Sequence, residues 1–159
     1  MSQDFAAACQ VYYDRVYRFL LALSGDPHQA EDLTQEVFYR ALLHIGRYRE
    51  QGQMFTWLCA IGKNLWLSQC RRRRGAPEPL HDTPQPGPEE ALAAREVQRA
   101  LRRAVAALPE DYRDVVILHV YGEIPLKEIS RLKGKSDSWA KVTYYRAKQM
   151  LRQELEGLQ

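Results

Sequence analysis

Cysteine is scarce in this sequence. The three cysteines, Cys9, Cys59 and Cys70, match neither a paired metal-ligand spacing nor a disulfide framework. If Cys59 and Cys70 share one helix, they lie about 16 Å apart along its axis, which is too far for a disulfide bond. We therefore expect three reduced thiols. A thiol-based sensor or enzyme that uses Cys59 or Cys70 is one alternative function, and replacing both by serine would test it.

Histidine is also sparse. The four histidines, His28, His44, His81 and His119, are scattered and form no metal-binding motif with the cysteines. No pairing of a nucleophile with a base stands out either. The sequence therefore predicts a protein that is not an enzyme and that needs neither a metal ion nor a cofactor.

Long hydrophobic runs are missing. No stretch reaches the roughly 20 apolar residues that a transmembrane helix needs. The start, MSQDFAAACQVYYDR, lacks the basic leader, apolar core and cleavage site of a secretory signal. We expect a cytoplasmic protein without membrane insertion of its own. Its apolar content of 45% is enough for folded cores, in one ordinary domain or two small ones.

One segment has almost no apolar residues. Residues 75–90, GAPEPLHDTPQPGPEE, contain five prolines, two glycines and four acids. This composition cannot bury a core and predicts a flexible acidic linker. On either side, residues 1–75 hold ten Lys/Arg against seven Asp/Glu, and residues 95–159 hold thirteen against nine. The two basic blocks suggest a polyanionic partner.

Apolar residues before the linker recur at helical spacing and predict three helices, over residues 4–24, from 27 to about 45 and from about 54 onward. Asp26 and Pro27 are typical of a helix start, with Gln29 at the capping-box position. The core-facing stripe expected for the third helix is Phe55, Leu58, Ile61 and Leu65.

A second edge of the third helix mixes an aromatic ring, an amide and a positive charge. Its residues are Trp57, Ile61, Asn64, Ser68 and Arg71, and four consecutive arginines, 71–74, end the segment. Bases stack on aromatic rings for about 1–3 kcal/mol each while arginines follow the phosphates, so this edge suits single-stranded nucleic acid. An ordinary core role for the aromatics is the alternative.

Beyond the linker, the pattern predicts helices over about 89–107, 111–121 and 125–132, and a long last helix to about 155. Lys133-Gly134-Lys135 is expected to form a turn and Ser136 an N-cap, as in a helix-turn-helix. The expected inward residues of the last helix are Ala140, Tyr144, Ala147, Leu151 and Leu155; the outward or flanking ones are Lys141, Val142, Tyr145, Arg146, Lys148 and Arg152.

Several of these stretches resemble one family. DLTQEVF from Asp32, GRYR from Gly46 and FTWLCAIGKN from Phe55, followed by the arginines, resemble region 2 of bacterial extracytoplasmic-function (ECF) sigma factors of the sigma-70 family. LPEDYR from Leu108, EIS, the turn glycine and YYRAKQMLR from Tyr144 resemble region 4. The resemblance implies an all-α protein of two small helical domains: region 2 in residues 1–74, a linker in 75–90 and region 4 in 91–159.

The resemblance also implies partners and sites. The chain would bind core RNA polymerase at the largest-subunit clamp helices and the flap, and the linker would thread the polymerase channels. It would also bind duplex and single-stranded promoter DNA and melt the minus-ten element. An anti-sigma factor would hold it inactive. The implied polymerase-binding residues are Asp32, Gln35, Glu36 and Arg40. The implied minus-ten residues are Tyr48, Arg49, Gln51, Gln53, Trp57, Lys63, Asn64, Arg71 and Arg72. The implied minus-thirty-five residues are His119, Ser136, Lys141, Val142, Tyr145, Arg146 and Lys148.

The chain departs from the family pattern at several places. Lys133 and Lys135 stand where aliphatic residues are usual, WAKVTY (139–144) replaces TVKSRL, and Cys59-Ala60 replaces an aromatic-arginine pair. The glycine between the first region-4 helices is displaced by one. These differences bear on the DNA contacts of region 4. The alternative within DNA binding is a stand-alone helix-turn-helix regulator, which should bind duplex DNA tightly without polymerase.

Overall fold

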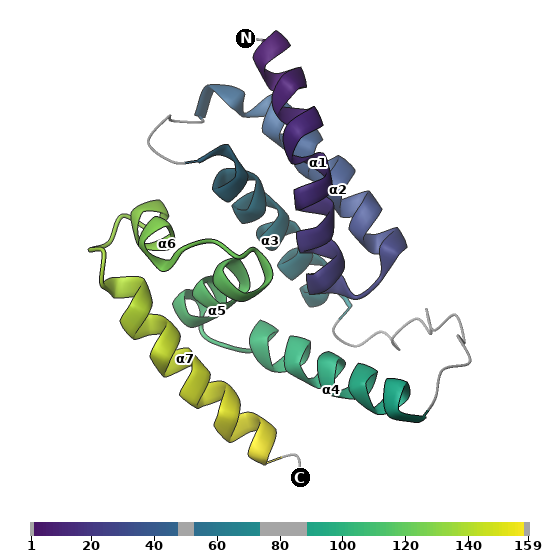
Figure 1. Ribbon diagram of the computed structural model, residues 1–159, viewed down its shortest axis with the longest axis vertical. Coiled ribbons are helices and arrows are strands. Elements are labelled where there is room, and N and C mark those ends of the chain that lie inside the picture. Colours follow the sequence, from purple (N-terminus) through teal and green to yellow (C-terminus); the bar gives the residue numbers. More distant parts are fainter. Residues whose placement is uncertain (1, 48–52, 74–88, 158–159) are drawn as a thin grey trace.

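The computed structural model describes residues 2–47, 53–73 and 89–157, and within these ranges all regular structure is helical (Figure 1). The N-terminal bundle, residues 2–73, contains α1 (Ser2–Ser24), α2 (Pro27–Leu43), the short 3₁₀ turn η1 (Ile45–Arg47) and α3 (Met54–Arg72). The C-terminal bundle, residues 89–157, contains α4 (Glu89–Ala106), α5 (Glu110–Val116), the π-helical turn η2 (Ile117–Tyr121), α6 (Leu126–Leu132) and α7 (Trp139–Glu156). The expected all-α fold class is confirmed.

In the N-terminal bundle, α1, α2 and α3 pack against one another around a core that includes Leu20, Leu33 and Leu58, each at most 2% exposed. Gly62 lets α3 come close to its neighbours, because a Cβ there would lie 3.2 Å from Leu20 Cδ2 and 3.3 Å from Val37 Cγ2. A larger side chain would have to displace two core residues.

The start of α2 agrees with the sequence prediction. The Asp26 carboxylate accepts a hydrogen bond of 2.9 Å from the His28 backbone N–H, and Pro27 is the first helical residue. Gln29 does not complete a capping box. Its side-chain amide instead donates to Gln69 Oε1 of α3, at 2.6 Å, and so joins two helices.

The buried face of α3 differs from the predicted stripe. Phe55 and Leu58 are buried as expected, whereas Ile61 and Leu65 are only half-buried. Cys59, Gly62, Lys63, Trp66 and Leu67 are buried instead. The physical reason is that α3 packs against α1 and α2 on one side and against η2 and α6 on another, so its buried face is wider than one stripe.

In the C-terminal bundle, α7 packs against α4, α5 and α6. The turn between α6 and α7 contains Gly134 with φ +67°, a left-handed conformation that favours glycine. The N-cap expected at Ser136 is wrong, because α7 begins at Trp139 and its cap residue is Ser138. The Ala140 backbone N–H is satisfied by Ser130 Oγ of α6, at 2.9 Å, so the start of α7 is tied to its neighbour rather than capped locally.

The two bundles touch. Figure 1 shows α5 and α6 beside α3, and η2 packs against both α1 and α3. Polar contacts that cross the boundary include Lys63 to Asp114, Thr56 to Glu128, and Arg102 Nε to the Ala22 carbonyl oxygen at 3.3 Å. Buried apolar residues of both bundles form one continuous core.

Candidate polymerase and promoter-DNA interface

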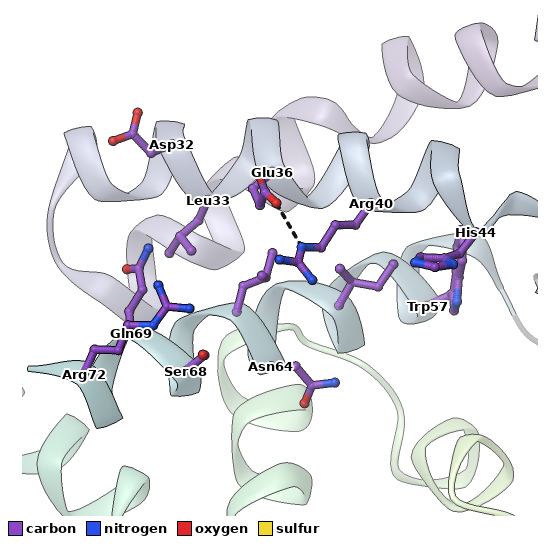
Figure 2. A pocket seen from close by; sticks show the side chains of 12 residues that line it. Asp32, Leu33, Glu36, Arg40, His44, Trp57, Asn64, Ser68, Gln69 and Arg72 are labelled. Carbon is purple, nitrogen blue, oxygen red and sulfur yellow. Dashed lines mark hydrogen bonds and ion pairs between the residues drawn. The ribbon is translucent and has the colours of Figure 1, made fainter.

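A groove of about 650 Å³ runs between α2 and α3 (Figure 2). Its α2 side is formed by Asp32, Leu33, Glu36, Arg40 and His44. Its α3 side is formed by Trp57, Ile61, Asn64, Leu65, Ser68, Gln69 and Arg72. The groove therefore brings together three of the residues expected to bind polymerase and three of those expected to bind minus-ten DNA.

The α2 side of the groove is charged and accessible. Arg40 Nε lies 2.9 Å from Glu36 Oε1, and both side chains are about half exposed, at 53% and 45%. Such a surface pair is worth at most about 1 kcal/mol, so either partner can exchange it for an incoming group. Asp32 and Gln35 are exposed on the same helix, although Gln35 does not line the groove.

The α3 side carries the edge that the sequence singled out. Trp57, Ile61 and Ser68 are half-buried and Asn64 is exposed, with its amide pointing away from α2 in Figure 2. An amide offers both donors and an acceptor to a base edge. Arg72 reaches the groove, whereas Arg71 is exposed outside it. Gln53, at the N-terminal end of α3, is exposed and makes no side-chain capping bond.

Lys63 lies on the other side of α3. It was expected to contact minus-ten DNA, yet it is only 5% exposed, and its Nζ lies 2.8 Å from Asp114 Oδ2 of the C-terminal bundle. Sequence periodicity could not place it there, because the partner is 51 positions away in the chain. In this arrangement of the bundles Lys63 does not reach solvent, so a DNA contact would require the bundles to separate.

Asp114 is the centre of a buried charge cluster. Lys133 Nζ lies 2.5 Å from the same Oδ2 atom, and Arg113 Nε lies 3.3 Å from Oδ1. Burial acts to raise the pKa of Asp114, but hydrogen bonds and charges from Lys133 and Lys63 outweigh it and hold the pKa below its ordinary 3.8. Burial lowers the pKa of Lys63 more than the contact with Asp114 raises it.

The outward face of α7 is as the sequence predicts. Lys141, Val142, Tyr145, Arg146 and Lys148 are all exposed, Val142 at 48% and Tyr145 at 60%. Ser136 is exposed in the turn before the helix. A basic helix of this kind, following a short helix and a turn, suits insertion into a DNA major groove.

His119 is half-buried in the C-terminal bundle and is not part of that face. Its Nδ1–H donates to the Ile124 carbonyl oxygen at 2.9 Å, and its ring meets Tyr144 edge to face at 4.7 Å between centroids. Lys148 Nζ in turn lies 4.8 Å from the Tyr144 ring centre. The structure thus connects His119 to the outward face of α7 through Tyr144, not directly.

Three predicted minus-ten residues, Tyr48, Arg49 and Gln51, lie outside the described residues, as does most of the predicted linker. Sequence reasoning missed other residues of the groove. His44 follows Arg40 by four positions and Gln69 follows Leu65 by four, so the helical spacing that placed their neighbours could have found them.

The environment of Cys59 does not activate its thiol. Cys59 is fully buried, and burial raises the pKa of its thiol, an effect that the charge of Arg15 opposes and that of Glu128 reinforces. A buried thiol with a raised pKa is a poor nucleophile. Among the residues that the structure describes, no group of His, Cys, Asp and Glu side chains could hold a metal ion, and no helix is long and apolar enough to span a membrane.

Comparison with known proteins agrees with this architecture. Residues 9–76 match Sigma-70 region 2 and residues 98–151 match Sigma-70 region 4. The ECF RNA polymerase sigma factor SigM of Bacillus subtilis is 30% identical over 147 residues, which cover 90% of each chain. SigW of the same organism is 27% identical over 170 residues, covering 97% of this chain and 90% of the relative.

Two helical bundles with these matches define a transcription initiation factor of the sigma-70 type. More closely, the chain belongs to the ECF RNA polymerase sigma factors, and as a sigma factor it directs RNA polymerase to promoters. The fold is shared with the sigma factor RpoE of Bartonella quintana, solved in complex with the anti-sigma factor NepR; the TM-score is 0.58 and the identity 21%, over 97% of this chain and 98% of that one.

Proposed function

We propose that the groove between α2 and α3 is where this sigma factor couples polymerase binding to opening of the minus-ten element. The observation that carries this proposal is that a single groove is lined by Glu36 and Arg40 of α2 and by Trp57 and Asn64 of α3. A factor that binds polymerase with one helix and a DNA base with the next fixes the two partners relative to each other. Such fixed placement is what promoter opening at a defined position requires.

On the α2 side, the polymerase clamp helices are the proposed partner of Asp32, Gln35, Glu36 and Arg40. All four are exposed or half-exposed, and the surface pair between Glu36 and Arg40 is weak enough to rearrange. The polymerase flap is the proposed partner of the C-terminal bundle.

On the α3 side, Asn64 is the proposed reader of one unstacked base, with Trp57 beside it and Arg71 and Arg72 along the backbone. Extruding a base costs a few kcal/mol, which stacking and a small number of hydrogen bonds can offset. Gln53 stands at the N-terminal end of the same helix. Lys63 belongs to this set only when the bundles are apart.

The outward face of α7 is the proposed reader of the minus-thirty-five element in duplex DNA. Lys141, Val142 and Tyr145 lie near the start of the helix, where side chains reach base edges. Arg146 and Lys148 follow with positive charge. His119 would act indirectly, by supporting Tyr144 behind this face, and Ser136 would act from the turn.

The remaining features of the proposal concern the whole chain. It works in the cytoplasm without catalytic activity or cofactor, and an anti-sigma factor holds it inactive, as NepR binds the structurally similar RpoE. The proposed division is region 2 in residues 1–74, a linker in 75–90 and region 4 in 91–159. Helix α4 begins at Glu89 and therefore includes the last two residues of that linker.

Reconstituted transcription tests this function. Core polymerase with the purified chain should give transcripts from a small set of genomic fragments, and core polymerase alone should not. A gel shift on the same fragments separates the stand-alone regulator, which would bind tightly without polymerase, from a sigma factor, which would not. Tight binding without polymerase and no promoter-dependent transcript would overturn the proposal.

A further inference from the structure

The contact between the two bundles is built from charge as well as apolar packing. Lys63 is 5% exposed and Asp114 is 1% exposed, and the two meet at 2.8 Å across the boundary. Lys133 joins them at the same carboxylate oxygen. We call Lys63, Asp114 and Lys133 the interbundle cluster.

The cluster is asymmetric. Asp114 has Lys133 and Arg113 as partners within its own bundle, so its charge is compensated whether or not the bundles touch. Among the described residues, Lys63 is paired with one carboxylate, that of Asp114. When the bundles close, the Lys63 ammonium therefore loses its contact with water and gains one carboxylate, which it shares with Lys133. A buried pair of this kind gains little net free energy, because desolvation offsets much of the attraction.

A second carboxylate of the C-terminal bundle contacts the same face of α3. The Thr56 hydroxyl donates to Glu128 Oε1 at 2.5 Å. Thr56 and Lys63 are seven positions apart, so they lie on one face of α3 with about 10 Å between them along the axis. Asp114 and Glu128 thus present two negative groups to one face of a helix whose neighbouring edge carries Asn64 and the arginines.

Asp114 and Glu128 thus place two anionic groups along the helix for which we proposed nucleic-acid binding, where the phosphates of a bound strand would compete with them. A lysine ammonium binds a carboxylate and a phosphate by the same charge-assisted hydrogen bonds. Burial lowers the pKa of Lys63, so the closed arrangement favours the charged ammonium less than water does.

We propose that Asp114, supported by Glu128, is an internal phosphate mimic that closes the C-terminal bundle onto α3 and competes with single-stranded promoter DNA for Lys63. The closed chain withholds Lys63 from DNA, and opening delivers it to the edge that carries Asn64. The competition with DNA rests on the minus-ten role proposed for α3, whereas the closure does not.

Asp114→Asn tests both parts in the full-length chain. The variant leaves Lys63 and Lys133 without a shared anion, so the bundles should separate and the radius of gyration in small-angle X-ray scattering should rise. A fluorescein-labelled single-stranded oligonucleotide of mixed sequence should then bind at least about tenfold more tightly by anisotropy, because a larger fraction of the chain is competent. Asp111→Asn, which removes an exposed acid from the same helix, is the matched control and should leave both values unchanged.

The outcomes separate the parts of the proposal. A radius of gyration equal to that of the wild type would overturn the proposed closure of the C-terminal bundle onto α3 by Asp114. A larger radius of gyration without tighter binding of the oligonucleotide would overturn the competition for Lys63. If the variant then still transcribes from a promoter like the wild type, the sigma function stands and only the competition is wrong.

If circular dichroism shows that Asp114→Asn does not fold, Lys63→Glu takes its place. This change leaves Asp114 with Lys133 in its own bundle and sets a second carboxylate against it across the boundary. The radius of gyration should again rise, and an unchanged value would overturn the proposed closure.

Discussion

The two bundles present the exposed residues that we propose to bind polymerase and DNA in opposite ways. In the N-terminal bundle these residues line a groove between two helices, and in the C-terminal bundle they stand on the convex face of one helix, α7. A groove can enclose an extruded base or a partner's helix, whereas a convex basic helix fits the major groove of intact duplex. The groove thus suits the proposed capture of a base from melted DNA, and the convex helix suits the proposed recognition of base-paired DNA.

The largest expected effect concerns the α2 wall of the groove, which we propose to bind polymerase. Glu36→Lys puts a positive charge on the α2 wall and beside Arg40, and like-charge juxtaposition at an interface costs several kcal/mol. We expect core polymerase to bind the variant about a hundredfold more weakly, with unchanged circular dichroism. Glu31→Lys, an exposed acid of α2 outside the groove, is the control for charge alone. Normal assembly by folded Glu36→Lys would contradict the assignment of this wall.

The next effect concerns the DNA side of the same groove. Asn64→Ala removes an exposed amide without disturbing the buried face of α3, so polymerase assembly should be normal. Loss of hydrogen bonds to a captured base should destabilise the open complex by about 1–3 kcal/mol. The lifetime of open complexes after heparin challenge measures this loss. Gln10→Ala, which truncates an exposed amide on α1, should leave the lifetime unchanged.

A smaller effect is expected on the convex face. Arg146→Ala should either weaken binding to all upstream sequences similarly, if the guanidinium contacts phosphate, or relax one base position by about 1–3 kcal/mol, if it contacts a base. Arg152→Ala, farther along the same helix and exposed, serves as its control. Holoenzyme binding to a set of single-base upstream variants distinguishes the two results, and no change in either would mean that this face is not the reader.

The smallest effect lies at the boundary between the bundles and depends on pH. Because the pKa of Asp114 lies below 3.8, its ionised form stabilises the folded chain above that pH, and this contribution is lost as pH falls through the lowered pKa. The groups that face it are Lys63, Lys133 and Arg113. The difference in urea midpoint between wild type and Asp114→Asn should therefore be constant above pH 3.8 and shrink below it. A difference that persists in acid would contradict this.

Local signals predicted much of the fold. Asp26 and Pro27 start α2, Gly134 forms the turn before α7, and the outward residues of α7 are exposed, because each depends only on helical periodicity or on a neighbour in sequence. The edge of α3 that carries Trp57 and Asn64 was found in the same way.

What the sequence could not predict depends on contacts between distant segments. Ile61 and Leu65 were expected in the core but are only half-buried, because α3 packs against α1 and α2 on one side and against η2 and α6 on another, and this packing buries Lys63 and Trp66. Ser136 was expected to cap α7, but the Ala140 backbone N–H at the start of that helix donates its hydrogen bond to Ser130 Oγ of α6. Lys133, a departure from the family pattern, pairs with Asp114 across 19 positions.

The coupling of the two walls of the α2–α3 groove is tested most directly by permanganate footprinting of holoenzyme with Asn64→Ala on two templates. On duplex promoter the variant should show little reactivity of minus-ten thymines. On a template with that region already mismatched, reactivity should recover only in part, because melting is relieved but recognition of the base is not. Wild-type reactivity of the variant on duplex promoter would contradict the assignment of Asn64, and with it the coupling of polymerase binding to base capture across the groove.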